Sequence, residues 1–253
     1  VAGDIARGDA DLAEHDGRLV GTFGDLACFS INEYKHISCG DAGLILTNDD
    51  ALAQRCALLM DKGYARTAET RDRNTAFLAL NYRMTELQGA VALAQLHKLR
   101  EIVNYQRMLY DRLHAGLQGI EGVILPRHAG LGSAWFFFLQ LDEEKLGVTR
   151  DWFVQALQAE GVGAGGYIPE PVYRTRLFLN RDTLGTSSLP FSLPGVEVGN
   201  RYDEGACPNA EFLLKTCIQV GIKMQNTPEE MEQTAAAFRK VAAYCLAQRK
   251  VAA

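Results

Sequence analysis

Lys35 is the residue whose type and setting most directly suggest chemistry. It follows a short apolar run, residues 26–31, and precedes a turn bounded by Gly40 and Gly43. Backbone on both sides can hold it in a partly dry loop, where burial lowers the pKa of a lysine because the charged ammonium is disfavoured. The free amine can then attack a carbonyl carbon. The alternative on local grounds is an ordinary solvated loop lysine.

The other candidate motifs point away from metal and dinucleotide chemistry. The six cysteines form no C-x-x-C pair and the five histidines no H-x-x-x-H pair, so the sequence predicts reduced thiols and no metal site. Residues 161–166 read G-x-G-x-x-G, but a predicted helix precedes them and Pro169 and Pro171 follow. The dinucleotide fingerprint needs a strand before it and a helix after it, so we set dinucleotide binding aside.

The composition is that of an ordinary globular protein. The chain has 253 residues, 47% of them hydrophobic and 23% charged, with a net charge of -5. This is enough for one large domain or two modest ones. No basic cluster suggests a nucleic-acid partner, and no apolar run approaches the roughly 20 residues that cross a bilayer. We therefore expect a cytoplasmic protein without nucleic-acid or membrane partners.

An α/β layer is predicted around the lysine loop. Residues 26–31 and 43–47 are short apolar runs typical of strands. A helix follows, capped by Asn48 or Asp49 and ended by Gly63. Strand, loop, strand and helix in this order begin an α/β layer.

A single long helix is predicted downstream. Thr85 and Gln88 have the spacing of a capping box, and an apolar stripe continues to about Gln118. We expect a helix of this length to link two domains. We divide the chain into residues 1–104, the C-terminal part of a large domain with the start of this helix, and residues 105–253, a small C-terminal domain.

The small domain alternates strands and helices. Residues 174–206 have little periodicity and predict a long irregular loop, which is usually functional or mobile. The last helix begins with Thr227 as its cap, Pro228 at its first position and Glu230 closing a capping box. The other predicted elements are a strand over residues 134–141, a helix over 149–160, a short helix from Pro208 and a strand over 217–222.

Two blocks of the sequence resemble the sugar aminotransferases of the DegT/DnrJ/EryC1/StrS family. The first block contains Cys28-Phe29-Ser30, Tyr34-Lys35-His36 and Gly40-Asp41-Ala42-Gly43, and the second reads Asn81-Tyr82-Arg83-Met84-Thr85-Glu86. The resemblance implies a pyridoxal-phosphate enzyme of the aspartate-aminotransferase-like fold. Its large domain is a three-layer α/β/α structure, here incomplete, and its small C-terminal domain is α+β.

The resemblance also assigns roles to particular residues. Lys35 would hold pyridoxal 5'-phosphate as a Schiff base, and Ser30 would bind the phosphate of this cofactor. Asn81 resembles the asparagine that reaches the phosphate of the neighbouring subunit, which implies a homodimer with shared active sites. The candidates for contact with substrate are Tyr34, His36, Tyr167 and Tyr173.

The N-terminal part of the chain departs from the family pattern. The family's Asp-x-Ala-Gln segment has its best counterpart in Asp4-Ile5-Ala6-Arg7. Asp4 would contact the pyridine nitrogen, and Arg7 stands where a glutamine is usual. The Gly-Thr-x-Ala-Leu phosphate loop and the aromatic residue that stacks on the cofactor ring have no counterpart. We therefore expect this chain to be the C-terminal portion of a longer family member.

The expected reaction moves an amino group from an amino acid, glutamate or glutamine, to a ketone. The acceptor is a keto sugar, often nucleotide-linked in this family, or a cyclitol ketone, as in amino sugar biosynthesis. The amine of Lys35 would transfer the α-proton as general acid and base, with ping-pong kinetics overall. Two alternatives stay open: a sugar dehydratase of the same family, which carries histidine at the lysine position, and a non-catalytic remnant or binding module.

Overall fold

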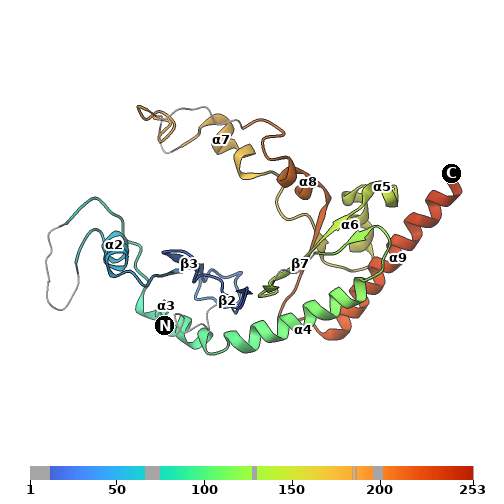
Figure 1. Cartoon of the computed structure of the whole chain (residues 1–253), viewed down its shortest axis with the longest axis horizontal. Coiled ribbons are helices and arrows are strands. Elements are labelled where there is room, and N and C mark those ends of the chain that lie inside the picture. The colour runs from blue at the N-terminus through green and yellow to red at the C-terminus, as the bar shows by residue number, and fades with distance from the viewer. Residues whose placement is uncertain are drawn as a thin grey trace. The chain divides into compact units, whose positions relative to one another are not determined.

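The computed structural model describes residues 12–65, 75–126, 130–183, 185, 187–195 and 202–252. The chain divides into two compact units (Figure 1). The first unit comprises Val1–Met108 and Arg127–Trp135, and the second comprises Leu109–Pro126 and Phe136–Ala253. The division into domains at residues 104 and 105 stays a prediction.

The first unit is built around an antiparallel hairpin. Strand β3 (Ala27–Ser30) pairs with β4 (Gly43–Leu46), so that Ser30 lies opposite Gly43. Helix α2 (Asp50–Met60) follows, and the Asp49 carboxylate caps it by accepting the N–H groups of Ala51 and Leu52 at 2.8 and 3.0 Å. The predicted order of strand, loop, strand and helix is confirmed.

A second small sheet in this unit was not predicted from the sequence. It has the strand order β2-β1-β6, with all pairs antiparallel. Each strand has two residues, too short to produce a readable alternation of side chains. The strands are β1 (Glu14–His15), β2 (Arg18–Leu19) and β6 (Gly130–Leu131).

The prediction of a single long helix after the hairpin is wrong. The structure has two helices there, α3 (Glu86–Leu96) and α4 (Leu99–Leu117). At the break, the Lys98 N–H donates to a carbonyl three residues back rather than four. Leu96 and Leu99 are both buried on either side of this tighter turn. The apolar stripe therefore continues through the break, so the break has no signal in the hydrophobic pattern.

The core of the first unit joins the hairpin to these helices. Its buried members come from the loop after β3, from one side of α3 and α4, and from Leu12 before β1. Partly buried residues of β4, among them Leu44 and Leu46, pack against it. The buried members are Leu12, Ile31, Ile37, Ala92, Leu96, Leu99 and Val103.

The second unit contains a four-stranded antiparallel sheet of order β5-β7-β9-β8. Its longest strand, β7 (Phe136–Leu141), alternates half-buried and buried residues, as a strand with one covered face does. The predicted strands over 134–141 and 217–222 are confirmed with slightly shorter bounds. The other strands are β5 (Val123–Ile124), β8 (Ala164–Gly165) and β9 (Cys217–Gly221).

Helices cover the buried face of this sheet. The core is rich in aromatic side chains: the rings of Phe153 and Phe238 lie 5.9 Å apart, and Phe137 of β7 is also fully buried. In Figure 1 the C-terminal half of α4 runs beside α9, and a Cβ on Gly116 would lie 2.6 Å from the Ala235 side chain. The helices are α5 (Glu143–Leu146), α6 (Arg150–Ala159) and α9 (Pro228–Ala252).

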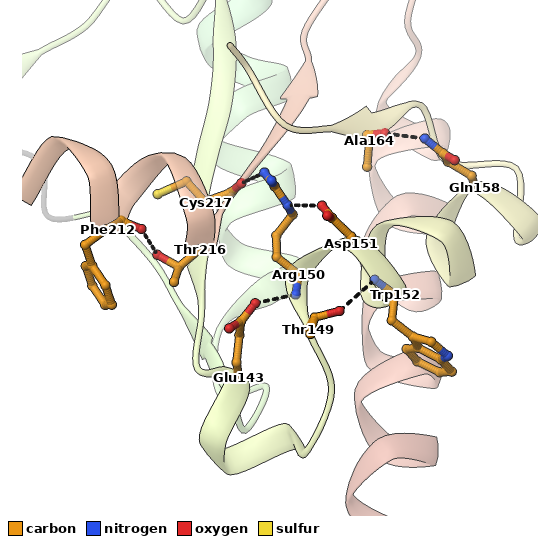
Figure 2. A network of polar contacts seen from close by, with 10 residues as sticks. All are labelled: Glu143, Thr149, Arg150, Asp151, Trp152, Gln158, Ala164, Phe212, Thr216 and Cys217. Carbon is orange, nitrogen blue, oxygen red and sulfur yellow. Dashed lines mark hydrogen bonds and ion pairs between the residues drawn. The ribbon is translucent and has the colours of Figure 1, made fainter. Parts of the chain in front are cut away.

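Arg150 joins several elements of the second unit, as Figure 2 shows. Its Nε donates to the Asp151 carboxylate at 2.6 Å, and its Nη1 donates to the Cys217 carbonyl at 3.0 Å. Its backbone N–H donates to the Glu143 carboxylate at 2.5 Å. The start of α6 is thereby fixed to α5 and to β9.

The region predicted as a long irregular loop contains short helical segments. A 3-10 turn, η2 (Val172–Arg174), leads into α7 (Arg176–Asn180) inside this region. The short helix predicted from Pro208, which lies beyond the region, is confirmed as α8 (Pro208–Thr216). The prediction of no structure over 174–206 is therefore wrong in part, because five-residue helices are too short for a 3.6-residue period to be detected. Within the described part of the chain, no helix has the length and apolar character to span a membrane.

Candidate active site

The loop that carries Lys35 is anchored at both ends. Ile31 and Ile37 are 3% and 8% exposed and belong to the core of the first unit. Between them the Lys35 N–H donates to the Asn32 carbonyl at 3.0 Å and closes a turn. Two buried isoleucines and this turn fix the backbone of Lys35, as the sequence predicted for a lysine held from both sides.

The amine of Lys35 lies against an aromatic ring. Lys35 is half-buried, and its Nζ lies 3.9 Å from the ring centroid of Trp135. This is a cation–π contact, worth about 0.5–1 kcal/mol at a partly exposed position. Among the described residues, Lys35 forms no ion pair with a carboxylate, so its amine is not neutralised by a fixed partner.

Residues 132–135, which we call the strap, are hydrogen-bonded to the lysine loop. The Trp135 indole N–H donates to the Tyr34 carbonyl at 2.8 Å, and His36 Nε2 donates to the Ser133 carbonyl at 2.9 Å. His36 therefore serves here to hold the strap. Tyr34 is 71% exposed.

Arg107 of α4 holds the other end of the strap. Its Nε donates to the Gly132 carbonyl at 2.6 Å, and its Nη2 donates to the Leu12 carbonyl. One guanidinium group thus connects a helix, the strap and the beginning of the described chain. Arg107 was not predicted as a site residue, since its role depends on contacts distant in sequence.

Ser30 ends strand β3 and is exposed. Its hydroxyl oxygen accepts the Asn32 N–H at 3.4 Å, which leaves its O–H to donate to another acceptor. Asn32 in turn accepts the Tyr34 N–H at 3.1 Å and donates to the Asp41 carboxylate at 2.5 Å. Ser30 and Lys35 are therefore parts of one hydrogen-bonded loop.

Cys39 is the thiol nearest in sequence to this loop. Burial raises the pKa of the Cys39 thiol, so it stays protonated at neutral pH. Its backbone N–H donates to the Ile31 carbonyl at 3.3 Å. Cys39 therefore contributes to the shape of the loop rather than supplying a nucleophile.

Asn81 lies at the end of an extended segment, residues 76–82. This segment hydrogen-bonds along residues 60–63, with the Lys62 N–H donating to the Leu80 carbonyl at 3.0 Å. Asn81 forms a β-bridge with Asp61 and is exposed. The buried Asp61 carboxylate pairs with Arg83, so Asn81 stands on a backbone fixed by an ion pair.

Tyr167 and Tyr173 belong to the second unit. The Tyr167 ring packs on Phe136 and Phe138 of β7, with centroids 5.6 and 5.7 Å apart. The Tyr173 hydroxyl donates to the Glu211 carboxylate and accepts the Cys207 N–H at 3.2 Å. Burial and the hydrogen bond to Glu211 raise the pKa of Tyr173 to about 12. The Tyr173 hydroxyl is thus engaged within its own unit.

Asp4 and Arg7 lie outside the described residues. Besides Arg107, two further residues of the site, Asn32 and Trp135, were not predicted from the sequence. An asparagine three residues before the lysine is a turn signal that could have been noticed. No local signal could have paired Trp135 with Lys35, because 100 residues separate them.

The described residues fit pyridoxal phosphate as far as they extend. The cofactor needs an amine to bond its aldehyde and donors for its phosphate. Lys35 provides an amine in no ion pair with the described residues, and Ser30 provides an exposed O–H five residues earlier. Both side chains are set on backbone that the core and the Asn32 hydrogen bonds hold in place.

Known proteins share this fold. The structure of DesI in the presence of its TDP-sugar product matches with a TM-score of 0.72 and 21% identity, covering 94% of this chain and 55% of DesI. DesV of S. venezuelae, in complex with a ketimine intermediate, matches with a TM-score of 0.73 and 23% identity, covering 91% and 55%. The uncharacterized protein MJ1066 of Methanocaldococcus jannaschii is 24% identical over 245 residues, covering 90% of this chain and 57% of MJ1066.

The similarity to these solved structures shows the class of fold. It is the fold of the pyridoxal-phosphate-dependent sugar aminotransferases, as predicted. The chain spans little more than half the length of these relatives. The sequence profile of the DegT/DnrJ/EryC1/StrS aminotransferase family matches residues 4–239. The chain therefore belongs to this family, and the resemblance of its two sequence blocks is confirmed.

Proposed function

We propose that this chain supplies the lysine-bearing part of a pyridoxal-phosphate-dependent aminotransferase. The observation that carries the proposal is the Lys35 amine, which stands on a fixed loop and contacts an aromatic face rather than a carboxylate. An amine committed to an ion pair would first have to leave it before bonding an aldehyde. Membership of the aminotransferase family supports the same reading.

When bound, the cofactor supplies an electron sink for the substrate carbon that loses its proton. Lys35 would bond the cofactor aldehyde and, when its amine is free, would hold and move the proton at its Nζ as general acid and base. Ser30 would donate its O–H to the phosphate. Asp4 would keep the pyridine nitrogen protonated. These roles follow the family pattern and the fit of Lys35 and Ser30.

The proposed substrates are those that the family resemblance implies. An amino acid, glutamate or glutamine, gives the amino group, and a keto sugar or cyclitol ketone receives it. DesI was crystallised with a TDP-sugar product, which supports a nucleotide-linked sugar as acceptor. Tyr34 and Tyr167, both more than half exposed, are the described aromatic candidates for contact with it. The six free cysteines favour the reducing cytoplasm.

A homodimer with shared sites is proposed from the surface around Asn81. Leu78, Leu80 and Tyr82 alternate along the extended segment and are 96%, 61% and 70% exposed. Leu87 of α3 is 81% exposed. Apolar side chains so exposed favour burial against another surface. In a dimer, Asn81 would reach the cofactor phosphate of the partner.

The dimer proposal is tested by the mass of the full-length protein in solution. Leu80→Asp places a charge in the proposed contact and should convert a dimer into a monomer by light scattering. The matched control is Leu193→Asp, at a leucine 47% exposed in the second unit, which should leave the dimer intact. A wild-type monomer at micromolar concentration would contradict the proposal.

Two other functions are distinguished by the products. The full-length protein is incubated with pyridoxal phosphate, glutamate and a TDP-linked keto sugar, and the sugar is analysed by mass spectrometry. Aminotransfer gives an amino sugar and 2-oxoglutarate together. A sugar that has lost a hydroxyl without gaining nitrogen would establish the dehydratase alternative. If the protein forms neither product and does not bind pyridoxal phosphate, the non-catalytic alternative holds.

A further inference from the structure

The contact between Lys35 and Trp135 is specific in its geometry. The Lys35 Nζ lies 3.9 Å from the indole centroid, and both residues are half-buried. Lysine carries its charge on a flexible four-carbon stem, so a free amine would otherwise sample many positions. Tryptophan is the aromatic side chain that attracts a cation most strongly. The ring therefore gives this amine a preferred position.

The Trp135 side chain is hydrogen-bonded to the same loop that carries Lys35. Its indole N–H donates to the Tyr34 carbonyl at 2.8 Å, and Tyr34 immediately precedes Lys35 in the chain. The ring is thus fixed relative to the backbone from which the lysine side chain extends. A movement of the loop would carry the ring and the amine together.

The backbone beside Trp135 is constrained as well. Ala134 has φ +58°, in the left-handed region that residues other than glycine rarely adopt. Such a conformation persists when its surroundings hold it, and the hydrogen bonds of His36 to Ser133 and of Arg107 to Gly132 do so on its N-terminal side. The strap is shaped to present the Trp135 ring.

We propose that Trp135 is a positioning residue for Lys35, which keeps the lysine amine at one place whenever that amine is not joined to another group. The value of such positioning rests on the proposed function, since an amine that transfers a proton must return to the same position in each cycle. The positioning itself rests only on the geometry of the strap, and it is tested without cofactor or substrate.

The test measures how fast each lysine of the 253-residue chain is acetylated by an excess of acetic anhydride, with mass-spectrometric mapping. Trp135→Leu removes the ring and should accelerate the acetylation of Lys35 by about two- to fivefold, the range of a cation–π contact. Trp135→Phe keeps a ring but loses the N–H donor, and should restore most of the protection. Trp152→Leu is the matched control in the second unit and should leave Lys35 unchanged.

Lys215, whose side chain is 71% exposed, is the internal standard in each variant. Equal Lys35 rates in the wild type and in a Trp135→Leu variant with an unchanged melting temperature would overturn the proposal. So would a Phe variant as fast as the Leu variant, because the indole hydrogen bond alone would then explain the protection.

A measurement on the wild-type chain covers the case in which the Leu variant does not fold. The ring current of Trp135 should shift the ε-methylene signal of Lys35 upfield of the other lysines in a carbon–proton spectrum, with Lys35→Arg providing the assignment. An unshifted signal would overturn the proposal. If the protein passes both tests but catalyses no aminotransfer, the proposed function is refuted and the positioning role of Trp135 still stands.

Discussion

The two units of this chain differ in how completely they bury their apolar side chains. In the second unit, Phe137, Phe153 and Phe238 are fully buried between the sheet and its helices. In the first unit, helix α2 has no buried residue, and Leu78 and Leu87 are almost wholly exposed. Yet the first unit carries Lys35. The unit that carries the proposed catalytic lysine is therefore the unit that leaves more of its apolar side chains exposed.

This difference has a physical meaning. An aromatic core closed on all sides stabilises a unit by itself, since the free energy of burial scales with the apolar area removed from water. A site shared between subunits needs surfaces that stay open until the partner covers them. We therefore expect substitutions in the first unit to change chemistry and association, and substitutions in the second to change stability.

The largest expected effect separates chemistry from stability. Lys35→Ala should lower aminotransfer by the full-length protein by at least about 10²–10⁴-fold, the usual contribution of a general acid and base. Its melting temperature should stay close to that of the wild type, because the side chain is half-buried and outside the core. Lys240→Ala, which removes an exposed pair with Glu160 in the second unit, is the matched control and should keep the activity.

Core truncation tests the other side of the comparison. Leu139→Ala removes a side chain that is 2% exposed in β7 and should lower the free energy of unfolding by about 2–5 kcal/mol. Leu80→Ala, in the first unit, should change it by no more than about 0.5 kcal/mol at protein concentrations where the chain is monomeric. Urea denaturation followed by circular dichroism measures both. Equal losses would show that the two units do not differ as described.

Helix caps apply the same chemistry to both units. Thr85 accepts the Gln88 N–H at 3.2 Å in α3, and Thr149 accepts the Trp152 N–H at 3.3 Å in α6. Each Thr→Ala change should cost about 1 kcal/mol. Hydrogen exchange should rise in α3 and in the Lys35 loop for Thr85→Ala, because Gln88 also donates to the Asp41 carbonyl at 3.0 Å. For Thr149→Ala the rise should be confined to the second unit; a rise in the lysine loop would contradict this.

The smallest effect is expected from Tyr173. Its pKa is raised to about 12, so its contribution to stability is complete below the ordinary tyrosine pKa near 10 and is lost as the pH rises toward 12. The melting temperature of Tyr173→Phe should therefore lie below that of the wild type near neutral pH, and the gap should narrow in alkali. Glu211→Gln weakens the same hydrogen bond. The difference in melting temperature that Tyr173→Phe causes near neutral pH should therefore also be smaller when it is measured in the Glu211→Gln protein. A gap that stays constant across this range would contradict the assignment.

Much of the local structure could be predicted because local rules decided it. The caps at Asp49, Thr85, Thr149 and Thr227 were readable from residue type and spacing, and the structure forms all four. The strands around Lys35 and at β7 followed from short apolar runs. The break before Leu99 was not readable, since the apolar stripe passes through it unchanged.

The site was predictable only in its sequence-local part. Ser30 and Lys35 lie in one motif, and both fall in the loop that the structure fixes. Trp135 and Arg107 join the same loop through contacts that no single-sequence pattern encodes. His36 and Tyr173, expected to contact substrate, are hydrogen-bonded to Ser133 and Glu211, so any substrate role must be compatible with those bonds.

The central claim is that Lys35 is the lysine that bonds pyridoxal phosphate. The direct test is to incubate the full-length protein with equimolar pyridoxal phosphate, reduce with borohydride and map the label by mass spectrometry. We predict a pyridoxyl-phosphate adduct on Lys35, with exposed lysines such as Lys215 and Lys240 unlabelled. An adduct spread evenly over the exposed lysines, with Lys35 unmodified, would contradict the account.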